Sequence, residues 1–117
     1  MTLGPTAADT RLPAWDETAA LSAVAGDADL ARELLAALIA GLPAELEGLR
    51  ATGRGNPAAL AEVAHHVRGA TRYCGVLALD AALERLEQAA KVSNAAGMTT
   101  GLALVEAEAA RLEADCG

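Results

Sequence analysis

Apolar residues recur every three or four positions between Leu30 and Leu49, and this pattern constrains the fold more than any other feature of the chain. The stripe consists of Leu30, Leu34, Leu35, Leu38, Ile39, Leu42, Leu46 and Leu49. This spacing places the residues on one face of an α-helix, so we predict a helix from Asp27 to about Arg50. Pro43 lies inside it. Because proline removes the hydrogen bond to the carbonyl of Ile39, we expect a kink or a short break there.

The remaining apolar residues also favour helices. Hydrophobic residues make up 53% of the 117, yet there is no Phe, one Trp and one Tyr. Ala and Leu, which supply most of the apolar content, form helices well, whereas the β-branched and aromatic residues typical of strands are scarce. A chain of this length is one domain, in which four or more helices can share a core.

Capping residues mark two further helices. The first is short and runs from Asp16 to Ala25, where Asp16 can cap it and Gly26 can end it in a left-handed conformation. Trp15 and Leu21 would dock this helix on the rest. Another helix follows the Gly53-Arg54-Gly55 turn and ends near Gly75. It opens with Asn56-Pro57, since asparagine caps free N–H groups and proline suits the first helical position.

A loop from Asn94 to Gly97 is predicted to separate the last two helices. The earlier helix runs from about Val76 to Ser93, and the later one is capped by Thr99 or Thr100. The inward residues of the later helix are Leu102, Val105, Ala109 and Leu112. Because the linkers are short, successive helices should be antiparallel neighbours. We therefore predict an all-α, antiparallel up-down four-helix bundle over residues 15–116, with a short extra N-terminal helix.

Residues 1–14 lack the basic start and apolar core of a secretory signal. They are predicted instead to be a disordered leader.

The net charge of −7 argues against binding to nucleic acid or to an anionic membrane. No run of 18 apolar residues lacks a charge, so no membrane span is predicted. Cys74 and Cys116 lie too far apart for a ligand pair and are expected to be reduced thiols in a cytoplasmic protein. A monomer is expected.

His65 is the residue that the fold does not explain. The apolar stripe of its helix consists of Leu60, Val63, Val67, Ala70, Thr71 and Cys74, and His65 falls almost opposite that stripe. Around it on the predicted wet face are Ala61, Arg68, Gly69 and Arg72. This face therefore offers an exposed imidazole next to small residues and to cations.

Such a face suits phosphoryl chemistry. Imidazole is a nucleophile near neutral pH, and Arg68 can pair with phosphoryl oxygens. Gly69 costs about 0.5–1 kcal/mol relative to Ala inside a helix, but it lets another protein come close, as does Ala61. Arg72 is an auxiliary candidate for holding the anion. His66 points about 100° away, toward the edge of the apolar stripe, and is interpreted as a structural residue or a rim contact.

Other polar residues are given structural interpretations. The two adjacent histidines are not a metal site, since helical ligand pairs need i,i+4 spacing and no third ligand is evident. Tyr73 is interpreted as packing at the edge of the stripe. Five charged residues are interpreted as solvated: Glu84, Arg85, Glu106, Glu108 and Arg111.

The tract H65-H66-V67-R68-G69-A70-T71 resembles the histidine phosphotransfer (HPt) domain motif H-x-x-[KR]-G-[AS]. The resemblance continues to Gly75, where that family also tends to have glycine, and covers about a hundred residues. Within the family, AHHVRGATRYCGV is most similar to the C-terminal HPt domains of hybrid sensor histidine kinases of the BarA/GacS type.

The resemblance implies a four-helix HPt bundle whose histidine accepts a phosphoryl group from a receiver-domain aspartate and passes it to another receiver. His65 would be the phosphoacceptor, Arg68 the basic residue near the phosphoryl group, and Gly69 the clearance position. In some members a Glu or Gln on the next helix hydrogen-bonds the histidine, and that offset falls on Glu87, with Gln88 beside it. The chain itself would need no cofactor, because the receiver would bring Mg²⁺.

Two alternatives remain open. The chain could be a fragment of a histidine kinase, but a kinase histidine is typically followed by an acidic residue and a nearby proline, whereas His65 is followed by His66. No Gly-rich nucleotide-binding segment is visible either, so no kinase activity of its own is expected. The other alternative is a helical adaptor that is not phosphorylated, against which the joint presence of His65, Arg68 and Gly69 argues.

Overall fold

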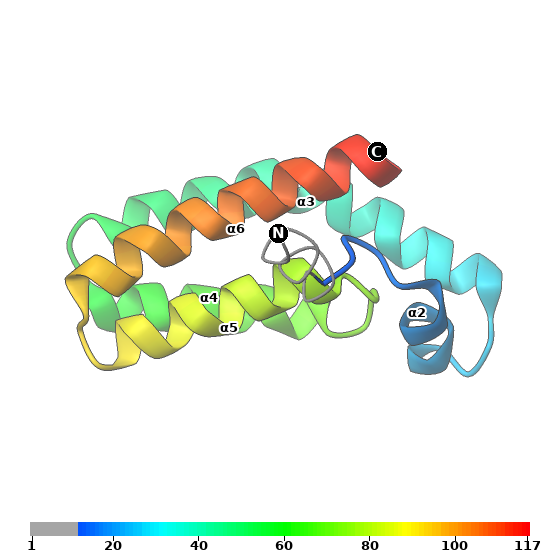
Figure 1. The fold of residues 1–117 in the computed structure, drawn as a ribbon, viewed down its shortest axis with the longest axis horizontal. Helices are drawn as coiled ribbons and strands as arrows, with labels where there is room; N and C mark the ends of the chain where they lie inside the picture. The colour runs from blue at the N-terminus through cyan, green and yellow to red at the C-terminus, as the bar shows by residue number, and fades with distance from the viewer. Residues whose placement is uncertain (1–11) are drawn as a thin grey trace, which may run out of the picture.

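The computed structural model describes residues 12–117, which contain five α-helices and no strand. The helices are α2 (Glu17–Ala23), α3 (Ala28–Gly53), α4 (Pro57–Thr71), α5 (Leu77–Lys91) and α6 (Ala95–Cys116). Helices α3 and α6 lie side by side in one layer and α4 and α5 in the other, while α2 lies at one end against α3 (Figure 1). The prediction of an all-α bundle with a short extra N-terminal helix is confirmed.

Three of the four long helices start at a side chain that caps them. Asp27 accepts a hydrogen bond from Leu30 N at 3.0 Å, and Asn56 accepts one from Ala59 N at 3.2 Å. Asn94 caps α6 by accepting from Gly97 N at 3.0 Å. The predicted loop from Asn94 to Gly97 and the predicted cap at Thr99 or Thr100 are therefore wrong. Asparagine satisfies the free N–H groups five residues earlier, and Ser93, at φ 54°, makes the turn.

Helix α3 continues through Pro43. The sequence predicted either a kink or a short break there, and the break does not occur. The axis of α3 instead changes direction between its cyan and green parts (Figure 1). Proline leaves the carbonyl of Ile39 without its usual partner, and its ring crowds that carbonyl, so a kink is the common response. The helix also extends past Arg50 to Gly53.

Helix α4 ends at Thr71, four residues earlier than the predicted end at Gly75, and a turn follows. Gly75 has φ +74°, and a Cβ atom there would lie 2.6 Å from the carbonyl oxygen of Asp16 and 2.8 Å from Cβ of Ala20. Asp16 N also donates to Gly75 O at 2.8 Å. Only glycine fits this close approach, which fixes α2 against the turn between α4 and α5.

The segment before α2 also packs on the bundle. Residues 1–11 of the predicted leader lie outside the described residues, but Ala14 is buried and Pro13 O accepts a hydrogen bond from Ala78 N at 3.2 Å. Trp15 packs against the core and donates from Nε1 to Cys74 O at 3.0 Å, which confirms its docking role.

The core lies between the four long helices and is dominated by leucine. Its largest fully buried apolar side chains are Leu49, Leu60, Leu79, Leu83, Leu86, Leu112, Val67, Val76 and Val105. Three residues that the periodicity placed inward or at the stripe edge are exposed instead: Leu30, Ala70 and Tyr73. Leu30 lies on α3, Ala70 lies on α4, and Tyr73 lies in the turn after α4.

Some residues predicted to be solvated are partly buried in ion pairs. Arg50 Nε lies 2.5 Å from Glu106 Oε2, which joins α3 to α6. Glu108 pairs with Arg111 at 3.0 Å, and Arg111 also donates to Leu12 O. Cys74 is buried and Cys116 is partly buried, both as free thiols. Within residues 12–117 no helix is both long enough and apolar enough to cross a membrane.

Candidate functional site

His65 lies in the middle of α4, and its side chain is 65% exposed. Its neighbours Ala64 and Val67 are buried in the core, so the helix is anchored directly beneath the imidazole. The structure therefore confirms that His65 lies on the face of α4 that points away from the core.

Glu87 of α5 is the residue that organises the site. Its carboxylate is only 3% exposed and accepts from three donors on two helices. Oε2 lies 3.1 Å from His65 Nδ1 and 3.1 Å from Lys91 Nζ, and Oε1 accepts from Arg68 Nη1 at 3.2 Å. A buried carboxylate needs such partners, because an unpaired charge in this position would cost several kcal/mol.

These donors fix the protonation state of Glu87. Burial of the carboxylate raises its pKa, but the hydrogen bonds from Lys91 and Arg68, with the charges of Lys91 and His65, outweigh burial. The pKa of Glu87 is therefore lowered from 4.5. An ionised carboxylate can only accept hydrogen bonds, so His65 Nδ1 must carry the proton of this contact. In the neutral ring, the lone pair is then on Nε2, at the far side of the imidazole.

Arg68 is less available than the sequence predicted. Its side chain is 18% exposed and faces the seam between α4 and α5, where Nε lies 3.5 Å from Asp80 Oδ1 in addition to the contact with Glu87. Asp80 is itself held by the hydroxyl of buried Thr71 at 2.7 Å. Burial lowers the pKa of Arg68, but hydrogen bonds and charge from Glu87 and Asp80 outweigh it and raise the pKa above its ordinary value, so the guanidinium stays charged.

The surface next to His65 is open toward the C-terminal end of α4. Gly69 is exposed, and a Cβ atom there would meet nothing within 4 Å. Arg72 is exposed and donates from Nε to Arg68 O at 3.3 Å. Ala61 does not belong to this open surface as predicted, because it is 8% exposed and belongs to the core. It lies on the arc of α4 that α5 covers.

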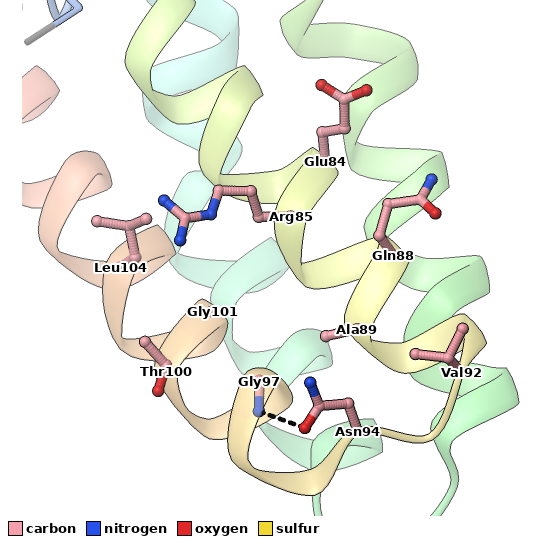
Figure 2. Close-up of a pocket in the computed structure, with 10 residues that line it drawn as sticks. All are labelled: Glu84, Arg85, Gln88, Ala89, Val92, Asn94, Gly97, Thr100, Gly101 and Leu104. Atoms are coloured by element: carbon pink, nitrogen blue, oxygen red, sulfur yellow. Dashed lines mark hydrogen bonds between the residues drawn. The ribbon is translucent and has the colours of Figure 1, made fainter. Parts of the chain in front are cut away.

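Gln88 does not join the site. It lines a hollow of about 630 Å³ between α5 and α6, shown in Figure 2, together with Arg85 and Leu104. Figure 2 also shows the hydrogen bond from Gly97 to the Asn94 side chain at the bottom of this hollow. The family offset fell on Glu87, which makes the contact with His65, whereas Gln88 beside it does not.

Sequence reasoning missed Lys91. It follows Glu87 by four residues on α5, a spacing that brings a glutamate and a lysine together on a helix and could have indicated the pair. Lys91 and Glu87 line a shallow hollow of about 480 Å³ with Ala61, Glu62, His65 and His66. His66 is exposed at the edge of this hollow, in agreement with its interpretation as a rim residue. No group of three or more possible metal ligands is found within residues 12–117.

The comparisons with known proteins agree with this geometry. The family model described as the Hpt domain matches residues 29–115. The chain therefore belongs to the Hpt domain family, whose members are histidine phosphotransfer modules of two-component signalling, and whose partners are receiver domains.

Two curated relatives carry the name GacS. The sensor histidine kinase GacS of Pseudomonas protegens is 44% identical over 85 residues, which cover 72% of this chain and 9% of that protein. The sensor protein GacS of Pseudomonas syringae pv. syringae is 41% identical over 101 residues, which cover 86% of this chain and 11% of that protein. The chain thus spans about a tenth of the length of these relatives. No solved structure matches the chain.

Proposed function

We propose that His65 is the phosphoacceptor of a phosphorelay, taking a phosphoryl group from the aspartate of one receiver domain and passing it to the aspartate of another. The observation that supports this most strongly is the contact between His65 Nδ1 and buried Glu87 at 3.1 Å, because it leaves the lone pair on Nε2 of an exposed ring. Both free thiols agree with a reducing compartment, so we place the exchange in the cytoplasm.

The transfer needs no acid or base from this chain. The Nε2 lone pair attacks phosphorus, the bond from phosphorus to the aspartate oxygen breaks, and its electron pair returns to the aspartate carboxylate. The ring becomes positively charged while Nδ1 keeps its proton, and the Glu87 carboxylate 3.1 Å away stabilises that charge. In the second transfer a carboxylate oxygen attacks phosphorus, and the electron pair of the N–P bond returns to Nε2.

The receiver would supply Mg²⁺ and the in-line geometry, and the surface of α4 would admit it. Gly69 leaves room one turn from the imidazole, and Arg72 adds an exposed cation nearby. The role we propose for Arg68 is to hold Glu87 and to keep the site electrically balanced, in keeping with its two carboxylate contacts.

The test is phosphotransfer from a radiolabelled, phosphorylated receiver. We expect acid-labile, base-stable label on the wild-type chain and on His66→Gln, and none on His65→Gln. ATP alone should give no label. Equal labelling of His65→Gln and the wild-type protein would refute the assignment of the phosphoacceptor.

A further inference from the structure

Lys91 contacts the site from a side that the phosphotransfer motif does not cover. It is the only lysine in the chain, in which the other eight basic residues are arginines. Its Nζ lies 3.1 Å from Glu87 Oε2, the same oxygen that His65 Nδ1 contacts at 3.1 Å. Lys91 therefore shares one acceptor with the imidazole and lines the same hollow.

Lys91 and Arg68 differ in how firmly they are held. Arg68 is 18% exposed and contacts two carboxylates, whereas the side chain of Lys91 is 54% exposed and pairs with Glu87 alone among residues 12–117. An ammonium on a flexible four-carbon stem can turn its donors to a new acceptor at little cost. If Lys91 moves away, Glu87 keeps its contacts with His65 and Arg68, so no buried charge is left unpaired.

The negative charge of a phosphoryl group on His65 would attract the nearby cations of the site. The carboxylates of Glu87 and Asp80 are balanced by the cations of Arg68 and Lys91 before phosphorylation. A phosphoryl group on Nε2 brings further negative charge and three strong acceptor oxygens. Of the two cations, only Lys91 is half exposed and singly paired.

We propose that Lys91 is a second phosphoryl-binding residue, whose ammonium turns from Glu87 to the phosphoryl oxygens when His65 is phosphorylated. This inference rests on the proposed function of His65. The contact would favour the phosphorylated form of the chain, and so would tune how much phosphate the histidine holds between two receivers.

The single lysine makes a direct measurement possible. Reductive methylation with ¹³C-formaldehyde labels Lys91 and the chain's N-terminal amine, and a dimethylated lysine keeps its charge and one N–H donor. Phosphoramidate, a small phosphodonor, phosphorylates histidine without a receiver. We expect the NMR signal of Lys91 to move on phosphorylation, with the amine of the N-terminus as internal reference, and to stay in place in His65→Gln. An unmoved Lys91 signal on phosphorylated protein would overturn the proposal.

Variants give an independent readout. In phosphoramidate, the steady-state ratio of phosphorylated to unphosphorylated protein should fall about three- to tenfold in Lys91→Gln, the range for a half-exposed, charge-assisted contact. Lys91→Arg should restore the ratio. Arg85→Gln removes one positive charge from the α6-facing side of α5 and should leave the ratio unchanged (Figure 2). A fall in Arg72→Gln but not in Lys91→Gln would assign the contact to Arg72 and refute ours.

This experiment separates the two proposals. If the Lys91 signal responds to phosphoramidate but no receiver transfers to His65, the inference about Lys91 stands and the relay role fails. If receivers transfer to His65 while the Lys91 signal stays in place, the relay role stands and the inference fails. Should phosphoramidate react too slowly, the same signal is followed on protein phosphorylated by a receiver, and absence of label from both donors refutes both proposals.

Discussion

A side chain at position 69 is predicted to stabilise the fold, and a large one is predicted to obstruct the binding of the partner. Gly69 lies in the last turn of α4, where a Cβ atom would have open space within 4 Å. Replacing glycine by a helix former there removes the entropic cost of glycine, and no clash offsets the gain. We expect Gly69→Ala to stabilise the fold by about 0.5 kcal/mol, the lower end of the range because the position is near the helix end.

A larger side chain should keep the fold and block the partner. Gly69→Gln should unfold at the same urea concentration as the wild type or a slightly higher one, since glutamine also forms helices better than glycine. Overfilling a closely packed contact costs typically 1–3 kcal/mol, so transfer from a phosphorylated receiver should slow by about tenfold or more. Phosphoramidate, which is small, should phosphorylate Gly69→Gln at the wild-type rate.

Urea denaturation and quenched-flow transfer kinetics measure the two effects separately. Gly48→Ala is the matched control: Gly48 is also helical, its added Cβ would make only an ordinary contact of 3.9 Å with Val63, and it lies on α3. That variant should gain stability and transfer normally. Wild-type transfer rates in Gly69→Gln would refute the clearance role, and a loss of stability in Gly69→Ala would refute the open geometry.

Two further predictions concern the fold. Because the pKa of Glu87 is lowered in the folded chain, the unfolded chain takes up this proton first as the pH falls, and the stabilising contribution is lost below about pH 4.5. Urea titrations at pH 7 and pH 3 should show the stability difference between wild type and Glu87→Gln shrinking in acid, and a constant difference would contradict this. Asn94→Ala should cost about 1 kcal/mol, because it removes the cap of α6, whereas Thr99→Ala should cost little. Equal losses in thermal melts would speak against the observed cap.

Helical periodicity predicted α4 well on the sides that lack neighbours. His65 and Gly69 are exposed as expected, because their positions on α4 face away from the core, even though Nδ1 of His65 reaches Glu87 of α5. It failed for Ala61 and Arg68, which were expected on the same wet face but are buried or partly buried. A helical wheel gives angles on one helix, whereas the width of the covered arc depends on how closely the next helix approaches.

The residues around His65 also depended on how neighbouring helices pack, which the sequence does not show. Glu87 was indicated by its offset in a family of similar domains, with Gln88 beside it. The packing of α5 against α4 turns Glu87 toward the imidazole and leaves Gln88 exposed at the edge of the hollow between α5 and α6. Lys91 was missed because an exposed lysine has no periodic signal, and its role depends on the buried carboxylate next to it.

The sequence alone determined that this chain is helical, where most of its helices begin, and that His65 stands apart from the core. These properties follow from local propensities, caps and a 3.6-residue period, which need no knowledge of the other helices. Only the tertiary structure decided which nitrogen of His65 is free and which cations surround it. Those features depend on a buried carboxylate that α5 brings within hydrogen-bonding distance of α4, and distances between helices are set by packing of the whole core.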